Sequence, residues 1–290
     1  MRRDDPRTRI LIYLLLTFAF SSYFYVQGHR HGLTAGIAFG IMWCPGVAAI
    51  ITSLLTRRSL REIGWRWGKS KYQLAAWVTP MLYAWPAYVL VWLAGLGGFP
   101  DQNFMGIFRQ RLHLAGYSDV LTLLAVYVVT ATVGVLAGSV NALGEEIGWR
   151  GLLVPELSRV TSFTNLSLFS GVIWALWHFP LIFWGNYNSG ETPRWYSATC
   201  FFLMVVGISF VFAWLRLRSG SMWTATIMHA AHNTIIQGFL TPLTIKNAKT
   251  PWFIDEFGAA MLPFVFVAAY YCWSKRRELP AQEAARAAGA

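Results

Sequence analysis

The chain has 290 residues, of which 56% are hydrophobic and 13% are charged, and its mean hydropathy is +0.43. This composition excludes an ordinary soluble globular domain and indicates a protein that crosses a membrane several times. The formal net charge of +11 follows from the placement of lysine and arginine around membrane spans and from attraction to anionic lipid, so no nucleic-acid partner is expected.

Eight apolar runs follow one another along the chain, and each is long enough, the shortest only just, to cross about 30 Å of hydrocarbon as a helix. The runs are 10–26, 33–55, 74–96, 120–143, 165–184, 196–215, 222–240 and 257–273. We therefore expect an all-α fold with about eight transmembrane helices. Residues 1–274 are expected to form a single transmembrane domain, and 275–290 a short cytoplasmic tail.

Lysine and arginine are distributed unequally between the two sides of these spans. If both termini are cytoplasmic, the inside segments hold 18 of the 24 basic residues and the outside segments hold the other six. This is the bias that the positive-inside rule describes. We predict an integral multi-pass protein of a prokaryotic cell membrane, with both termini in the cytoplasm and the lipid bilayer as a partner.

Carboxylates and histidines that are expected at membrane depth gather in three places, one of them together with an amide. They are Glu145 and Glu146 in NALGEEIGWR, His178 in VIWALWHFPL, and His229, His232 and Asn233 in ATIMHAAHNTII. All other acidic residues are expected in tails, loops or span ends. An ionisable group at membrane depth costs several kcal/mol unless it faces a cavity or a partner, so these residues are candidates for a functional site.

The acidic pair is followed by an arginine on the same helical face as its second member. Glu146 can pair with Arg150, four residues later, whereas Glu145 is rotated by about 100° and stays free. A helix that continues to about residue 154 would place Glu145 about 13 Å inside the span. We therefore expect one long, tilted fourth helix. Gly144 and Gly148 flank the pair and indicate the close approach of another helix.

The histidines of the fifth and seventh runs reach a comparable depth. His178 lies about 20 Å from the start of its run, and His229 lies about 12 Å from the start of its own. Asn233 shares a helical face with His229, whereas His232 is about 60° away and either reaches the same cavity or contacts a neighbouring helix. We expect these groups to converge with Glu145 in a cavity that opens to the cytoplasm.

Together these side chains carry the chemistry of a peptidase that has no covalent nucleophile. A glutamate beside an imidazole can hold and deprotonate a water molecule. A second imidazole and an amide can then donate hydrogen bonds to the oxyanion that forms when this water attacks a carbonyl carbon. The sequence contains neither a GxSxG nor an HExxH motif.

A zinc site is the alternative use of the same residues. Glu145, His178 and His229 could act as a set of two histidines and one carboxylate with an open fourth position. We favour hydrolysis without a metal or any other cofactor, because the ligands would come from three separate helices. Asn233 adds to this preference, since an amide is a poor zinc ligand and a good oxyanion donor.

Three motifs, EEIGWR, WALWH and HAAHN, occur in this order on three late spans. Their combination resembles the CAAX-processing and bacteriocin-processing family of intramembrane endopeptidases, whose eukaryotic members are the type II CAAX prenyl endopeptidases. The resemblance extends from Glu145 to Asn233, and the first 110 residues carry no family motif. Trp174 stands where the family usually has phenylalanine, which bears on the shape of the pocket.

The resemblance implies catalytic roles for four residues and supporting roles for two. The implied roles are general base for Glu145, partner of the base for His178, oxyanion site for His229 and Asn233, and support for Glu146 and Arg150. It also implies that residues 1–274 form a catalytic domain.

The implied substrate is a peptide or a lipidated, CAAX-like protein. A non-enzymatic bacteriocin-immunity or peptide-binding membrane protein is the alternative. A proton-coupled transporter is a third reading, against which the lack of inverted repeats and of paired broken helices in the sequence argues.

Overall fold

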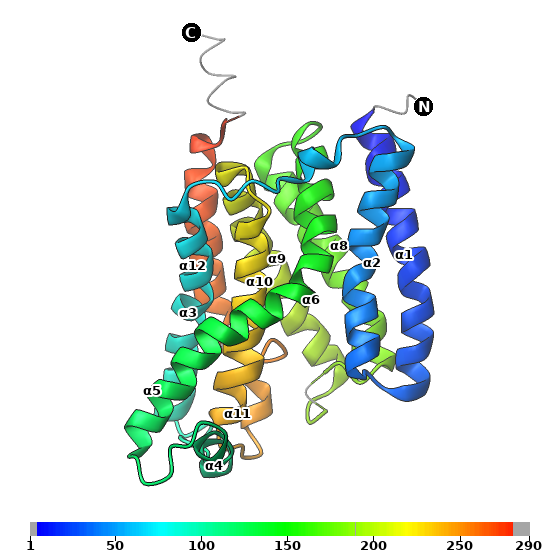
Figure 1. The fold of residues 1–290 in the computed structure, drawn as a ribbon. Helices are drawn as coiled ribbons and strands as arrows, with labels where there is room; N and C mark the ends of the chain where they lie inside the picture. Colours follow the sequence, from blue (N-terminus) through cyan, green and yellow to red (C-terminus); the bar gives the residue numbers. More distant parts are fainter. Residues whose placement is uncertain (1–4, 189, 281–290) are drawn as a thin grey trace.

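The computed structural model describes residues 5–188 and 190–280 as a bundle of helices (Figure 1). The described residues contain no β-strand, only an isolated antiparallel bridge between Gly98 and Ile245. Six helices in this part of the chain are long and apolar enough to cross a membrane. The prediction of an all-α, multi-pass membrane protein is therefore confirmed.

Five of the six long helices are single elements, and the sixth is a composite. The single helices are α1 (Pro6–His31), α2 (Ala35–Leu55), α3 (Ser70–Leu93), α8 (Phe163–Trp184) and α9 (Arg194–Ser219). The composite runs without a break over 40 residues, Asp119–Ser158, and crosses the bundle diagonally (Figure 1). The prediction of one long, tilted fourth helix is confirmed.

The composite helix changes its winding twice. Its segments are α5 (Asp119–Val129), the π-helical turn η2 (Thr130–Gly134), α6 (Val135–Gly148), the π-helical turn η3 (Trp149–Leu153) and α7 (Val154–Ser158). Insertions of π-helix into an α-helix occur often at functional sites. The second insertion begins at Trp149, three residues after the acidic pair of α6, so the winding changes beside the candidate site.

The two remaining predicted spans depart from ideal membrane helices. The seventh is α10 (Trp223–Ile235), which continues through the π-helical turn η4 (Ile236–Leu240) into α11 (Thr241–Leu243). Its histidines and amides lower its hydropathy. The eighth, α12 (Leu262–Ser274), begins five residues later than the predicted 257. Residues 250–261 form turns instead, and Pro263 lies in the first turn of α12, where its missing N–H interrupts no helical hydrogen bond.

Short elements complete the fold. They are η1 (Leu60–Ile63), α4 (Gln102–Arg111), η5 (Thr250–Trp252) and η6 (Lys275–Glu278). The predicted tail thus begins as a 3-10 turn, and the Trp214 indole donates to the carbonyl of Lys275 over 3.3 Å. The rest of that tail, 281–290, and residues 1–4 lie outside the described residues. The division at residue 274 stays a prediction.

The bundle has two ends that differ in composition. We call one the basic end: it carries Asp5, Pro280 and the connections at 56–69, 159–162 and 220–222. We call the other the distal end: it carries the connections at 32–34, 94–118, 185–193 and 244–261 (Figure 1).

At the basic end Glu156 is completely buried, with Arg58 at 2.9 Å and Arg9 at 3.5 Å. Glu156 thus lies near a span end, as expected, but it is buried there among basic side chains.

Helix α2 crosses α6 at backbone contact, as the two glycines predict. A Cβ atom on Gly144 would lie 2.8 Å from the carbonyl oxygen of Met42, and one on Gly148 would lie 2.6 Å from Cβ of Pro45. From the other side, a Cβ atom on Gly46 would lie 2.5 Å from the carbonyl oxygen of Gly144. The glycines therefore let α2 press against the segment that carries the acidic pair.

Replacing Gly148 by alanine is expected to lower the free energy of unfolding by about 1–3 kcal/mol, because backbone atoms of α2 must move to admit the methyl group. Thermal unfolding and folded yield in detergent measure this effect. Gly36→Ala is the matched control on α2, since a Cβ atom there meets nothing within 4 Å. Equal stability of both variants would contradict the packing role of Gly148.

Candidate active site

A cavity lies among α2, α6, α8, α9 and α10, and the three sequence motifs meet on its wall. Glu145 from α6, His178 from α8, and His229 and Asn233 from α10 all line it. Glu146 does not line the cavity and is fully buried. The structure therefore brings together the four residues for which the motifs predict catalytic roles, and it places the predicted supporting pair behind them.

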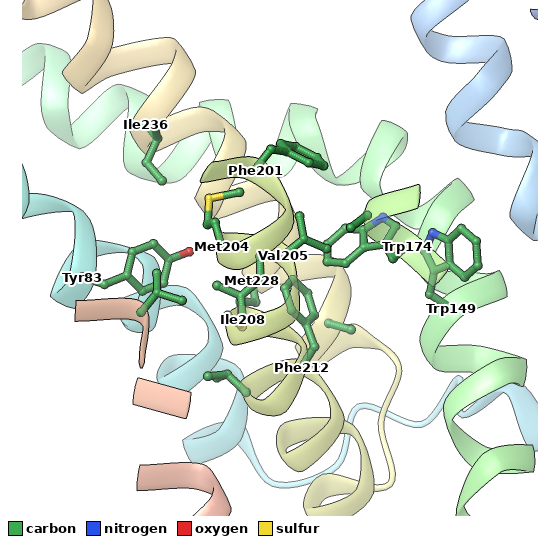
Figure 2. Packing of buried hydrophobic residues seen from close by; sticks show 14 of the residues in the cluster. Tyr83, Trp149, Trp174, Phe201, Met204, Val205, Ile208, Phe212, Met228 and Ile236 are labelled. Carbon is green, nitrogen blue, oxygen red and sulfur yellow. The ribbon is translucent and has the colours of Figure 1, made fainter. Parts of the chain in front are cut away.

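Two indole groups hold the Glu145 carboxylate. Its Oε2 atom accepts hydrogen bonds from Nε1 of Trp149 over 3.1 Å and from Nε1 of Trp174 over 2.8 Å. Figure 2 shows the indole nitrogens of both tryptophans turned toward the same region. Within the described residues nothing donates to the other oxygen, Oε1, so this atom is available to water or substrate. The tryptophan at position 174 adds a donor that a phenylalanine lacks.

The Glu146 carboxylate binds two partners through one oxygen. Its Oε1 atom lies 2.9 Å from Nη1 of Arg150 and 2.9 Å from Nδ1 of His229. The arginine is the partner that the four-residue spacing predicts. Its guanidinium group lies between the rings of Trp174 and Phe212, 4.0 Å from each ring centroid. Cation–π contacts of this kind strengthen when water is excluded, and Arg150 is only 1% exposed.

His178 is held in one orientation by its own helix and by aromatic neighbours. Its Nδ1 atom lies 2.9 Å from the carbonyl oxygen of Trp174. A carbonyl oxygen only accepts, so Nδ1 carries the proton and Nε2 of the neutral ring is a free base. The rings of Trp177 and Phe201 pack against the imidazole, with centroids at 4.7 and 4.8 Å. The orientation is therefore suited to accepting a hydrogen bond from water.

The contact of His229 with Glu146 determines what its second nitrogen can do. Nδ1 donates to the carboxylate, so Nε2 can donate to an oxyanion only when the ring is a cation. The formal charges of Glu145, Glu146 and Arg150 sum to −1, and a protonated His229 brings this buried group to neutrality. Asn233 lines the same wall, and within the described residues its amide has no hydrogen-bond partner.

One face of α9 supplies the largest single share of the apolar wall. Phe201, Met204, Val205, Ile208 and Phe212 line the cavity, and their spacing of three and four residues places them on one stripe of the helix. Figure 2 shows these side chains along α9, with Phe212 close to Trp174. The site therefore combines a small polar centre with a long apolar strip.

A second polar group, which the sequence motifs do not indicate, lies on the same cavity. Glu256, expected in a loop outside the membrane, lines the cavity and is 3% exposed. It accepts a hydrogen bond from the hydroxyl of Tyr187, and its Oε2 atom lies 3.5 Å from Nε2 of His232. The other nitrogen of His232 lies 2.6 Å from the hydroxyl oxygen of Tyr83. In the sequence, the only sign that Glu256 belongs to the site is its position directly before the last apolar run, 257–273.

These contacts also resolve the two readings of His232. Both of its ring nitrogens already have partners in the protein, so it links α3, α10 and the 244–261 loop. Tyr187 connects this group to the first one, because its ring stacks on His178 with a centroid separation of 5.9 Å. His232 therefore lies on the cavity wall and also contacts its neighbours.

Glu145, His178 and His229, which the sequence offered as zinc ligands, line one cavity without forming a ligand group in this arrangement. Among the described residues no group of three or more His, Cys, Asp or Glu side chains is placed to hold a metal. One oxygen of Glu145 faces two indole N–H donors, and Nδ1 of His229 faces Glu146. These contacts leave Oε1 of Glu145 and the Nε2 atoms of His178 and His229 without a partner among the described residues, and hydrolysis without a metal stays a prediction.

Comparison with known proteins agrees with the motifs. Residues 120–235 match the family model described as type II CAAX prenyl endopeptidase Rce1-like. CAAX prenyl protease 2 of Methanococcus maripaludis is 36% identical over 89 residues, which are 29% of this chain and 32% of that protein. The match thus spans about a third of the curated relative. Residues 120–235, which hold all three motifs, are thus similar to type II CAAX prenyl endopeptidase Rce1-like proteins, as the motifs predict.

Proposed function

We propose that this protein is an intramembrane endopeptidase that hydrolyses a peptide bond with a water molecule activated by Glu145 and His178. One observation carries the proposal: a free carboxylate oxygen of Glu145 and the imidazoles of His178 and His229 share the wall of one buried cavity. Groups able to take a proton and groups able to stabilise negative charge are thus close to the same space.

The reaction follows from the free atoms of these side chains. A water molecule held by Oε1 of Glu145 and Nε2 of His178 gives a proton to the carboxylate while its oxygen attacks the carbonyl carbon. The new oxyanion accepts hydrogen bonds from the Asn233 amide and from Nε2 of protonated His229. The carbon–nitrogen bond then breaks, and Glu145 returns the proton to the leaving amine. Glu146 and Arg150 position His229.

The proposed substrate is a peptide or a lipidated protein at the bilayer. The apolar strip on α9 suits a hydrophobic chain, and the curated relative bears the name of a CAAX prenyl protease. A non-enzymatic immunity or peptide-binding protein with the same cavity is the competing function. The two differ in turnover, since a binding protein retains its peptide without cleaving it.

Glu145→Gln is expected to lower the rate of cleavage of a fluorogenic peptide by about 10²–10⁴-fold, because the amide cannot take a proton from water. The amide oxygen still accepts from both indoles, so folding is preserved. Glu62→Gln, at a side chain that is 43% exposed at the basic end, serves as the control and retains activity. Peptide binding without cleavage by the wild-type protein would favour the competing function.

Arg150→Ala is expected to lower folded yield together with activity, because it leaves Glu146 charged and buried at a cost of about 3–5 kcal/mol. Arg150→Lys keeps the charge but loses the planar stacking between Trp174 and Phe212, so an intermediate loss of stability is expected. Thermal unfolding in detergent measures both. An Arg150→Ala protein as stable as the wild type, yet inactive, would show that the arginine acts on substrate instead.

Exhaustive chelation is expected to leave activity unchanged, because the proposed water is activated by Glu145 and His178 alone. Elemental analysis of the same samples is the companion measurement. Stoichiometric zinc, with activity lost on chelation and restored by the ion, would overturn the metal-free mechanism.

A further inference from the structure

The polar wall of the cavity is longer than the group that the proposed reaction uses. His229 and Asn233 from α10 are followed on the same wall by Gln237, which lies in the π-helical turn η4. The three positions are four residues apart, so their side chains repeat about every 6 Å along one face. The proposed hydrolysis accounts for the first two and gives Gln237 no role.

Gln237 is a partly buried amide that has no partner in the protein. Among the described residues, nothing donates to its side-chain oxygen and nothing accepts from its side-chain nitrogen. An amide in apolar surroundings is costly while its hydrogen bonds are unmade. The turn that carries it also departs from α-helical winding, as turns at functional sites often do. Both features indicate a group that binds a ligand in the cavity.

The apolar strip of α9 lies level with this polar wall. Helices α9 and α10 are joined by 220–222 and run in opposite directions, so residues equally far from this connection lie at similar depth. Phe212 is seven residues before the end of α9, and His229 is six residues after the start of α10. Their rings pack edge to face, with centroids 6.3 Å apart. The count along the two helices therefore agrees with an observed contact.

Two further pairs follow by the same count. Ile208 and Asn233 lie eleven and ten residues from the joined ends, at about 15–17 Å of helix. Val205 and Gln237 each lie fourteen residues away, at about 21 Å. The cavity thus has one polar and one apolar side chain at each of three levels, which are about 5–6 Å apart.

An extended peptide has a period that matches these levels. It advances about 3.3 Å per residue, and its carbonyl groups point to the same edge at every second residue, about 6.6 Å apart. A helical segment offers no such row, because each of its carbonyl groups is bonded within the helix. The spacing of the wall therefore favours a substrate that is extended beside α10.

We propose that Gln237 is a substrate-binding residue, whose side-chain NH₂ group donates to the main-chain carbonyl two residues away from the scissile one. This inference rests on the proposed proteolytic function. With the oxyanion at Asn233, the next carbonyl on the same edge of an extended peptide comes level with Gln237. Side chains on one face of the peptide then pack against Ile208 and Val205.

Gln237→Leu tests the contact from the side of the protein, because leucine is of similar size but neither donates nor accepts. For a cleaved fluorogenic peptide we expect kcat/KM to fall about 5–50-fold, chiefly through a higher KM, since a contact remote from the reacting bond is made equally before and in the transition state. Gln110→Leu, at an exposed position of α4 outside the cavity, is the matched control and keeps wild-type kinetics. Thermal unfolding in detergent checks that both variants are folded. Unchanged kinetics, or a fall in kcat alone, overturns the inference.

Modified peptides test the same contact from the side of the substrate. One amide of the parent peptide is replaced by a trans alkene, which removes a single main-chain carbonyl, either two residues before or two residues after the scissile one. We expect the wild type to lose about 5–50-fold on one of these two peptides, and Gln237→Leu to lose nothing further on that peptide. Losses that multiply, or a wild type that cleaves both as fast as the parent, overturn the inference.

A binding measurement separates this contact from the proteolytic function. Labelled parent and alkene peptides are titrated with Glu145→Gln protein, and fluorescence polarisation reports their affinities. Weaker binding of one alkene peptide, with no such difference in the Glu145→Gln/Gln237→Leu double variant, supports the contact, whereas equal affinities overturn it. A wild type that binds the parent peptide but cleaves none refutes the proteolytic function, and the affinities still decide the role of Gln237.

Discussion

Two adjacent carboxylates at membrane depth are the constraint on which the rest of this structure depends. Charged groups in a medium of low polarity need close partners, and neighbouring like charges raise that need. The chain meets it in two ways. Glu146 is neutralised by an arginine one helical turn away, whereas Glu145 is held through one oxygen by neutral indole donors. One acid is thus neutralised within the protein, and the other keeps one oxygen free of donors among the described residues.

This arrangement determines how the surrounding helices pack. The indoles that reach Glu145 come from η3 and α8, and the arginine needs aromatic faces from α8 and α9 on both sides. Large side chains therefore fill one flank of α6. On its other flank, glycines allow α2 to approach at backbone distance. The acidic pair is held between a rigid aromatic wall and a close helix, which leaves little freedom for either carboxylate to reorient.

A second polar group shares the cavity and extends it toward the distal end. Glu256 comes from a connection between helices, and it meets Tyr187 from another connection and His232 from α10. Since Tyr187 stacks on His178, the two polar groups are in contact through aromatic rings. The distal connections are thus part of the cavity wall, whereas those at the basic end cover it from behind. The asymmetry between the ends belongs to the site itself.

The sequence by itself determined the membrane class, the long fourth helix, the Glu146–Arg150 pair and the resemblance of three motifs to one family. These features depend on composition and on the 3.6-residue period of single helices, and both follow directly from the amino-acid sequence. Only the tertiary structure decided that His229 bonds to Glu146, that Trp149 and Trp174 hold Glu145, and that Glu256 enters the cavity. Such contacts join separate helices or unwound connections. They depend on how each helix is rotated and where each turn ends, and periodicity in one segment carries no information about either.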